Sequence, residues 1–306
     1  RVGDSLETTW QDRLVACRPG DIDSLIAFVQ ERCMQFSPLS LATALHRIAA
    51  VGGEARPGDC GGLVARIEDV LQARPESFRA QSLANMGWAL AKLQWPLPGL
   101  QKRLCEASLQ QLVRFKSPEL SMVLWGVATS PAVPPDVQRS ALEAVAAEFQ
   151  RRGAASFDGQ SIATVAYAAG MLGLPADDGL WPAISAGSVE RVDEFSDRQL
   201  ANLVWAFATV AHSDSVDPLF SRVEAHHILD LAPIDLSLVA WAFAKVGRGG
   251  APFFGEVASA ILAKEQLWKT SDTRNIATLV YAFALAGHAS SSDAAFRALA
   301  SSVVGR

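Results

Sequence analysis

Sequence features that would signal a familiar chemical site are scarce in this chain of 306 residues. The four cysteines are Cys17, Cys33, Cys60 and Cys105. They form no CxxC pair, which argues against a zinc knuckle or a redox motif, and we expect reduced, mostly buried thiols. No Asn-x-Ser/Thr acceptor occurs, so nothing indicates secretion.

Long hydrophobic runs are also missing. The longest, near residues 276–287 and 203–211, fall short of the about 20 apolar residues that cross a bilayer, so no membrane span is predicted. The chain begins at Arg1, which fits a processed precursor, a fragment or a trimmed chain equally well.

Positive charge is not in excess. Lys and Arg total 27 against 32 Asp and Glu, a net charge of −5, whereas nucleic-acid-binding surfaces usually carry a basic excess. The composition therefore disfavours a protein that binds nucleic acid mainly through its charge. A basic stripe on one face is still compatible with this composition.

No constellation of catalytic residues stands out. His226 and His227 are adjacent, so on a helix they diverge by about 100° and do not form an i, i+4 metal pair. The segment 247–250 is glycine-rich but lacks the Lys-Ser/Thr of a phosphate loop. We predict no enzyme activity, no cofactor and no metal site.

What the chain does contain is one phrase of eleven residues that returns seven times. It reads LATALHRIAAV at Leu41, LANMGWALAKL at Leu83, LSMVLWGVATS at Leu120, IATVAYAAGML at Ile162, LANLVWAFATV at Leu200, LSLVAWAFAKV at Leu236 and IATLVYAFALA at Ile276. The steps of 42, 37, 42, 38, 36 and 40 residues are typical of a solenoid of helical pairs.

Positions within the phrase, counted from zero, follow a helical pattern. Positions zero, three, seven and ten are apolar, as expected for the buried face of an amphipathic helix. Positions one and eight are small and flank an aromatic ring at position five, as in Ala201, Trp205 and Ala208. This second set predicts close helix packing with the ring in the core. Stacking of these Trp and Tyr rings on bases is the alternative interpretation.

Punctuation supports a helix, a turn and a second helix in each unit. A phenylalanine stands five residues before five of the phrases, at Phe36, Phe78, Phe115, Phe157 and Phe195. Cap-type residues such as Ser37, Ser117, Asp158 and Ser196 follow it. Second helices are expected to begin near Pro98, Pro135, Pro218 and Pro252.

The predicted fold is thus all-α, an α–α superhelical solenoid of about seven helix-turn-helix repeats plus an N-terminal capping unit. We expect residues 1–35 to form a degenerate capping unit and residues 36–306 to form one continuous repeat array.

The phrase resembles the octotricopeptide repeat, found with RAP-domain proteins in the organelles of algae and related protists. The likeness rests on Leu-Ala-Asn followed by Trp-Ala-Leu-Ala at residues 83–91 and Trp-Ala-Phe-Ala at residues 200–208, and on the matching parts at Leu236 and Ile276. His46 and Arg47 depart from the pattern, and no segment looks like a RAP domain. The resemblance implies binding of single-stranded organellar RNA, in the chloroplast or mitochondrion, for transcript stabilisation, processing or translation.

A binding surface is predicted at positions minus two, two and nine, which share a third helix face. Its polar members are Gln81, Asn85, Lys92, Gln160, Thr164, Arg198, Asn202, Thr209, Lys245, Arg274 and Thr278. Lys245 is position nine of the sixth phrase. We call this face the stripe. Two copies break it, with Pro118 and Met122 in one and Ile234 and Leu238 in the other.

Two interpretations of the stripe fit the sequence equally well. Polar, variable residues on a fixed scaffold suit a modular base reader, but they also suit the solvated edge near a helix start. The acidic charge and the apolar members favour an alternative function, a non-catalytic protein-interaction scaffold or an accessory subunit of a large organellar complex such as a ribosome or a photosynthetic or respiratory assembly.

Overall fold

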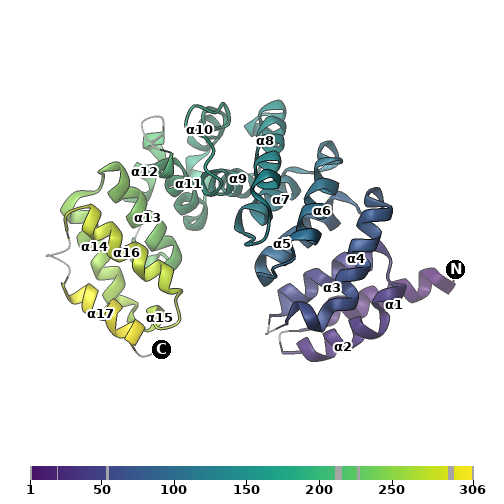
Figure 1. Ribbon diagram of the computed structural model, residues 1–306. Coiled ribbons are helices and arrows are strands. Elements are labelled where there is room, and N and C mark those ends of the chain that lie inside the picture. The colour runs from purple at the N-terminus through teal and green to yellow at the C-terminus, as the bar shows by residue number, and fades with distance from the viewer. Residues whose placement is uncertain are drawn as a thin grey trace. The chain divides into compact units, whose positions relative to one another are not determined.

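We describe the protein from a computed structural model, over residues 2–18, 20–52, 55–210, 216–225, 228–288 and 293–304. Within these residues all regular secondary structure is helical and no strand occurs (Figure 1). The prediction of an all-α helical-repeat fold is confirmed. None of the described helices is both long and apolar enough to cross a membrane.

Each phrase lies on the first helix of a pair. The first helices are α3 (Pro38–Val51), α5 (Ala80–Leu93), α7 (Ser117–Thr129), α9 (Gly159–Met171), α11 (Asp197–Thr209), α13 (Pro233–Val246) and α16 (Thr273–Leu285). The second helices are α4 (Gly61–Ala73), α6 (Pro98–Leu109), α8 (Pro135–Arg152), α10 (Leu180–Glu190), α12 (Asp217–Glu224), α14 (Gly250–Ala263) and α17 (Asp293–Val304). Three further helices are α1 (Val2–Ala16), α2 (Ile22–Arg32) and the short α15 (Glu265–Trp268).

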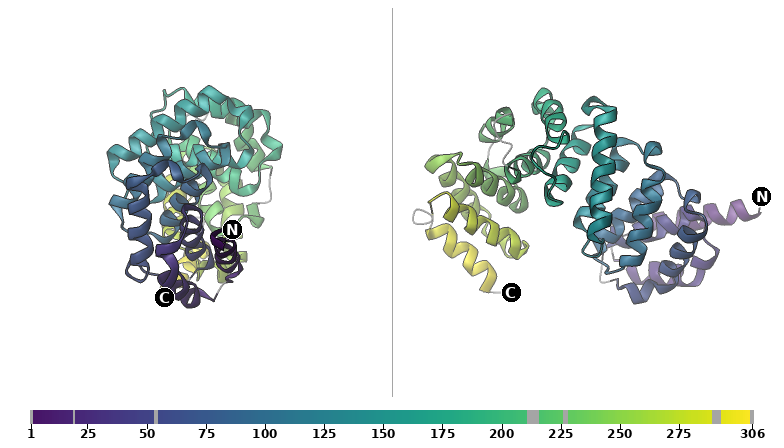
Figure 2. Two further views of the ribbon diagram at one scale, coloured as in Figure 1. Left: turned by 90° about the vertical axis from the view of Figure 1, so that its right-hand side faces the viewer. Right: turned by 45° about the horizontal axis from the view of Figure 1, so that its top comes forward.

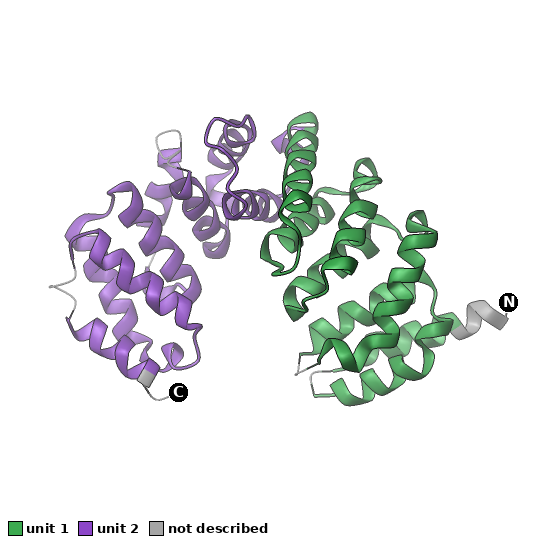
Figure 3. Cartoon of the chain, in the orientation of Figure 1, with its two compact units in different colours: residues 1–152 green, residues 153–306 purple. Residues whose placement is uncertain are grey.

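The chain divides into two compact units, residues 1–152 and 153–306 (Figure 3). The division falls directly after α8, so each unit holds whole repeats. In the first unit α3, α5 and α7 pack in order, and in the second α9, α11, α13 and α16 do so (Figures 1 and 2). The capping unit at residues 1–35 and the single array over 36–306 stay predictions.

The apolar positions of the phrase form the core of each pair. In α11, Leu200, Leu203 and Phe207 are at most 1% exposed. Fully burying one such side chain contributes about 1.5–3 kcal/mol, which explains why short helices hold together as stacked pairs.

A short 3-10 turn and a buried phenylalanine lead into most first helices. The turns are η1 (Cys33–Gln35), η3 (Pro75–Ser77), η4 (Leu112–Arg114), η5 (Ala154–Ser156), η6 (Val192–Glu194) and η8 (Ile228–Asp230). The five predicted phenylalanines that follow them are all buried. They anchor the entry of the chain into each helix.

Cations from the ends of second helices hold these turns by hydrogen bonds to their carbonyl oxygens. Arg152 Nη1 donates to Phe115 O at 2.6 Å and Arg191 Nη1 donates to Phe157 O at 2.9 Å. Lys264 Nζ donates to Leu231 O at 2.6 Å in the same way. Because an unmet buried carbonyl costs free energy, each contact fixes a turn against its second helix.

The prediction is correct for three of the four named residues, because Ser37, Asp158 and Ser196 are the N-cap residues of α3, α9 and α11. Ser37 Oγ accepts from Ser40 N, and Asp158 Oδ1 accepts from Ser161 N at 2.7 Å. At Ser196 the backbone N–H donates to Gln199. Ser117 was expected to cap and does not, because Lys116 precedes the helix and its backbone N–H donates to Glu119 at 2.7 Å.

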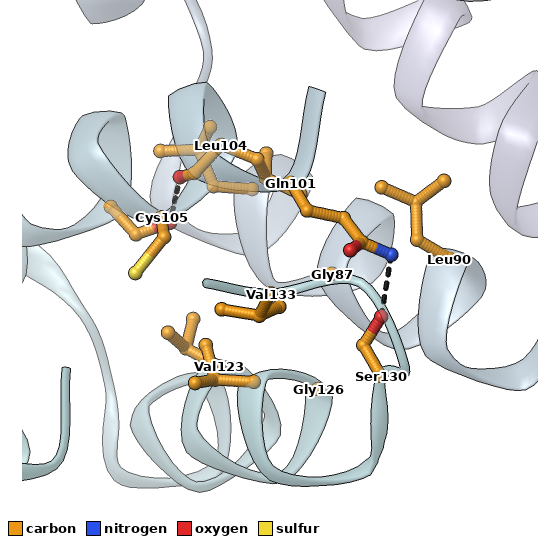
Figure 4. Close-up of a pocket in the computed structure, with 12 residues that line it drawn as sticks. Gly87, Leu90, Gln101, Leu104, Cys105, Val123, Gly126, Ser130 and Val133 are labelled. Atoms are coloured by element: carbon orange, nitrogen blue, oxygen red, sulfur yellow. Dashed lines mark hydrogen bonds between the residues drawn. The ribbon is translucent and has the colours of Figure 1, made fainter. Parts of the chain in front are cut away.

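Consecutive first helices approach closely where both carry small residues. A Cβ added to Gly126 of α7 would lie 3.0 Å from the backbone of Gly87 in α5. Figure 4 shows both glycines beside a small, mainly apolar pocket where α5, α6 and α7 meet, bridged by a hydrogen bond from Gln101 Nε2 to Ser130 Oγ. Cys105 lines the pocket, and burial raises the pKa of its thiol to about 12.

Three of the four thiols are buried, as predicted: Cys33, Cys60 and Cys105 are buried and Cys17 is half-buried. All four are free cysteines. Burial also raises the pKa of Cys60, to about 11, so that its thiol stays protonated near neutral pH.

Replacing Gly126 by alanine tests the close approach. The added methyl group must push α7 from α5, so we expect Gly126→Ala to lose about 1–3 kcal/mol of unfolding free energy. Gly255→Ala is the matched control, because nothing lies within 4 Å of a Cβ there and a helical Gly→Ala change stabilises by about 0.5–1 kcal/mol. Urea unfolding measures both. Equal effects of the two changes would contradict helix contact at Gly126.

Glu148 of α8 makes a second test. It is 7% exposed and accepts hydrogen bonds from Arg151 and Arg152, which lower its carboxyl pKa from 4.5 to about 2. Because the folded pKa is depressed, the stabilisation is complete above about pH 4.5 and is lost as the pH falls towards 2.

We therefore expect Glu148→Gln to lower the unfolding free energy at pH 7 by about 1–3 kcal/mol. The difference from wild type should shrink steadily in melts recorded between pH 4.5 and pH 2. The exposed Glu143 of the same helix provides the control variant Glu143→Gln, expected to change little. A Glu148→Gln deficit that does not depend on pH would refute the assignment.

Candidate functional site

The rings at position five form a row along the first helices of each unit. They are His46, Trp88 and Trp125 in the first unit and Tyr167, Trp205, Trp241 and Tyr281 in the second. Ring centroids lie 5.0 Å apart for His46 and Trp88, 4.8 Å for Tyr167 and Trp205, and 6.0 Å for Trp205 and Trp241. We call these seven residues the ring row.

The prediction that the Trp and Tyr rings at position five belong to the core is wrong. None of the seven is buried, and Tyr281 is 57% exposed. The small neighbours expected around them are buried in α11, where Ala201 and Ala208 are fully covered. Those small residues let consecutive helices touch, so the ring has no space between them and lies across the preceding helix instead. A Cβ on Gly170 of α9 would lie 3.3 Å from the ring of Trp205.

Helix geometry places the ring row within the stripe. With about 100° per residue, position five lies about 20–60° from positions minus two, nine and two. The sequence signal was present in this spacing, but the neighbouring small residues suggested the core. Aromatic faces and polar side chains therefore share one surface on each unit.

The predicted stripe residues occupy this surface at two levels of exposure. The exposed members are Gln81, Lys92, Gln160, Arg198, Lys245 and Arg274, and the half-buried members are Asn85, Thr164, Asn202, Thr209 and Thr278. The structure brings them together within each unit only by stacking the helices that carry them.

Several polar groups of the stripe are already hydrogen-bonded. Thr209 Oγ1 donates to Trp205 O and Thr278 Oγ1 to Arg274 O, each at 2.8 Å. Gln160 donates to Thr164 at 3.0 Å and accepts from Gln199 of the next repeat at 3.1 Å. The hydroxyl groups of Thr209 and Thr278 thus already donate their hydrogen bonds. What these two threonines can offer a ligand is the lone pairs of their hydroxyl oxygens.

Arg198 has a structural partner that sequence reasoning missed. It forms an ion pair with Asp235 of α13, which is 4% exposed. Burial raises the pKa of Asp235, while the charge of Arg198 lowers it. Asp235 looks like an ordinary first-turn acid in the sequence, so no local signal revealed its burial.

Two other cations of the stripe are Lys92 and Arg274. Lys92 Nζ lies 4.9 Å from the centroid of the Trp88 ring, a cation–π contact. The guanidinium of Arg274 is 90% exposed. Burial raises the pKa of Tyr167, and the charges of Arg198 and Arg274 partly offset that rise.

His46 keeps the ring row intact in the copy that departs from the phrase. Burial lowers its pKa, and the charges of Arg47 and Lys92 lower it further, so its imidazole is neutral at pH 7. His46 thus presents a neutral, flat ring at position five, as the Trp and Tyr residues of the other copies do. Arg47 donates to the backbone oxygens of Leu14 and Cys17 and so fastens α1 to α3.

Apolar side chains interrupt the stripe, as the sequence indicated. Ile234 is 37% exposed, Met171 42% and Leu285 44%, while Met122 and Leu238 are half-buried. Among the described residues no group of three or more His, Cys, Asp or Glu side chains is arranged to hold a metal ion. His226 and His227 lie outside the described residues.

The ion pair between Arg198 and Asp235 predicts a stability effect. Arg198→Ala leaves the buried carboxylate of Asp235 without its half-exposed partner, so we expect a loss of about 1–3 kcal/mol, whereas Arg274→Ala should stay within about 0.5 kcal/mol. Thermal and urea unfolding of both variants check this. If the two variants unfold alike, Arg198 has no structural role.

Comparison with known proteins shows a distant relative. No protein-family model matches the chain. Over 220 residues the chain is 25% identical to a RAP domain-containing protein, chloroplastic, of Oryza sativa subsp. japonica. The matched region covers 69% of this chain and 30% of that protein. The chain thus spans under a third of that relative's length.

Proposed function

We propose that this chain is a single-stranded RNA-binding helical-repeat protein of an organelle, of the octotricopeptide type. The observation that carries the proposal is the ring row, of which six rings are half-buried and Tyr281 is exposed, set within a polar stripe on consecutive helices. A regular series of flat rings beside hydrogen-bonding groups matches the chemistry of an unpaired nucleotide strand.

Each part of this surface has a role in the proposal. Aromatic faces stack on bases regardless of sequence, at about 1–3 kcal/mol per base. The side chains at positions minus two, two and nine differ between repeats, for example Asn85, Thr164 and Asn202 at position two. Such amide and hydroxyl groups can contact base edges, which gives one nucleotide contact per repeat.

The net charge of −5 does not oppose the proposal as strongly as composition suggested. Asp235 is buried and paired, whereas Lys92, Lys245 and Arg274 are exposed on the stripe. Charges beyond about 8 Å are largely screened at physiological salt, so these nearby cations determine what a phosphate meets.

Location and role follow from resemblance rather than from geometry. The relative is named a chloroplastic protein, and we propose a chloroplast location, with the mitochondrion as the alternative that the resemblance allows. Transcript stabilisation, processing or translation would then be the task, without catalysis. Residues 1–35 would cap an array over residues 36–306.

A protein-interaction scaffold is the second candidate. The exposed apolar residues Met171, Ile234 and Leu285 on the stripe favour it, because they offer no group to a phosphate or a base edge. In that case the same face would hold a subunit of a large organellar complex.

Salt-dependent binding of a fluorescent, mixed-sequence single-stranded RNA tests the first candidate. We expect Lys245→Ala with Arg274→Ala to weaken binding and to reduce the slope of log affinity against log salt by about 1.4, for two lost phosphate contacts. Arg139→Ala with Arg297→Ala removes the same charge from exposed positions on second helices and should leave the slope nearly unchanged.

Two outcomes would reject RNA binding. One is the absence of any salt-sensitive affinity, and the other is an equal effect of the two double variants. Purification of the native protein as a stoichiometric, RNase-resistant subunit of an assembly would establish the scaffold instead.

A further inference from the structure

An open hollow lies on the ring row of the second unit. It is lined by Trp205, Trp241, Ala277, Thr278 and Tyr281, from α11, α13 and α16. Three aromatic rings and two small side chains thus line an open space that the rings themselves do not fill.

The hollow differs from the rest of the ring row. Upstream, Tyr167 and Trp205 lie 4.8 Å apart, so each ring covers part of its neighbour. On α16 the exposed Ala277 and the 57% exposed Tyr281 leave the lining of the hollow uncovered. A flat ligand can reach aromatic faces here without displacing a packed ring.

Two cations flank this space. Lys245 is exposed one turn after Trp241 on α13, an i, i+4 spacing at which side chains are neighbours. Arg274 lies one turn before Thr278 on α16, and its side chain is 90% exposed. Its Nη2 atom lies 3.3 Å from Oδ2 of Asp272. Arg198, the other nearby cation, is occupied by the buried Asp235.

We propose that the hollow binds one nucleobase of a single-stranded RNA by stacking, with the adjoining phosphates held by Arg274 and Lys245. This rests on the proposed RNA-binding function and assigns its main base-stacking contact. The Thr278 hydroxyl donates to Arg274 O, so its oxygen accepts a hydrogen bond from a base N–H. Cations on both sides of an aromatic hollow suit a base between two phosphates better than an uncharged apolar side chain.

Filling the hollow tests the proposal without removing any contact of the fold. Ala277→Leu places a larger side chain in the lining, and Ala284→Leu makes the same change at another exposed alanine of α16, outside the lining. Binding of a fluorescent oligouridine is measured by anisotropy for the full chain, with melts to confirm folding. We expect Ala277→Leu to weaken binding about 5- to 100-fold, the effect of losing one stacked base, and Ala284→Leu to change it less than twofold.

Two further measurements separate stacking from phosphate contact. Tyr281→Ala should weaken binding similarly to Ala277→Leu, and Tyr281→Phe should restore it, because only the ring is required. An abasic sugar-phosphate oligomer of equal length should bind wild type and Ala277→Leu alike.

The outcomes distinguish the hollow from the wider function. If wild type binds oligouridine in a salt-sensitive manner and Ala277→Leu binds equally well, the hollow is not the base site and RNA binding stands. Equal losses in Ala277→Leu and Ala284→Leu also overturn the assignment. If wild type binds no RNA at all, the proposed function itself fails.

Discussion

Close contact between consecutive first helices is the constraint on which the rest of this structure depends. Where Gly126 of α7 meets the backbone of Gly87 in α5, no side chain fits between the helices. Large residues at nearby positions must therefore point out of the contact. The ring row is the result: small residues bring the helices together, and the rings come to lie side by side on the surface that remains.

A second consequence concerns charge. Many cations of this acidic chain are used within the fold: Arg47 binds the backbone oxygens of Leu14 and Cys17, Arg152 and Arg191 hold the turns before α7 and α9, and Arg198 pairs with a buried carboxylate. The sum of charges therefore says little about any one surface. What matters for a polyanion is the position of the cations that stay exposed, and those on the stripe stand next to aromatic rings.

The sequence was sufficient for the fold and insufficient for the surface, for physical reasons. Seven copies of one phrase define the helical period and the buried face, because burial of Leu200 or Leu203 depends only on the helix they occupy. Exposure of Trp205 depends on how near the next helix comes, and the pairing of Arg198 with Asp235 joins residues 37 positions apart in different repeats. Neither follows from the pattern within one helix.

The first repeat shows what the ring position requires. In place of Trp or Tyr this repeat carries His46. Burial and the charges of Arg47 and Lys92 lower the pKa of His46, so its side chain is an uncharged flat ring at neutral pH. Its ring centroid lies 5.0 Å from that of Trp88, with the two ring planes tilted by 36°. Indole, phenol and neutral imidazole have little in common except a planar π-face. A surface that keeps planarity while its neighbouring polar groups vary suits a ligand with a repeating flat part and a variable edge, which is the chemistry of a nucleic-acid strand.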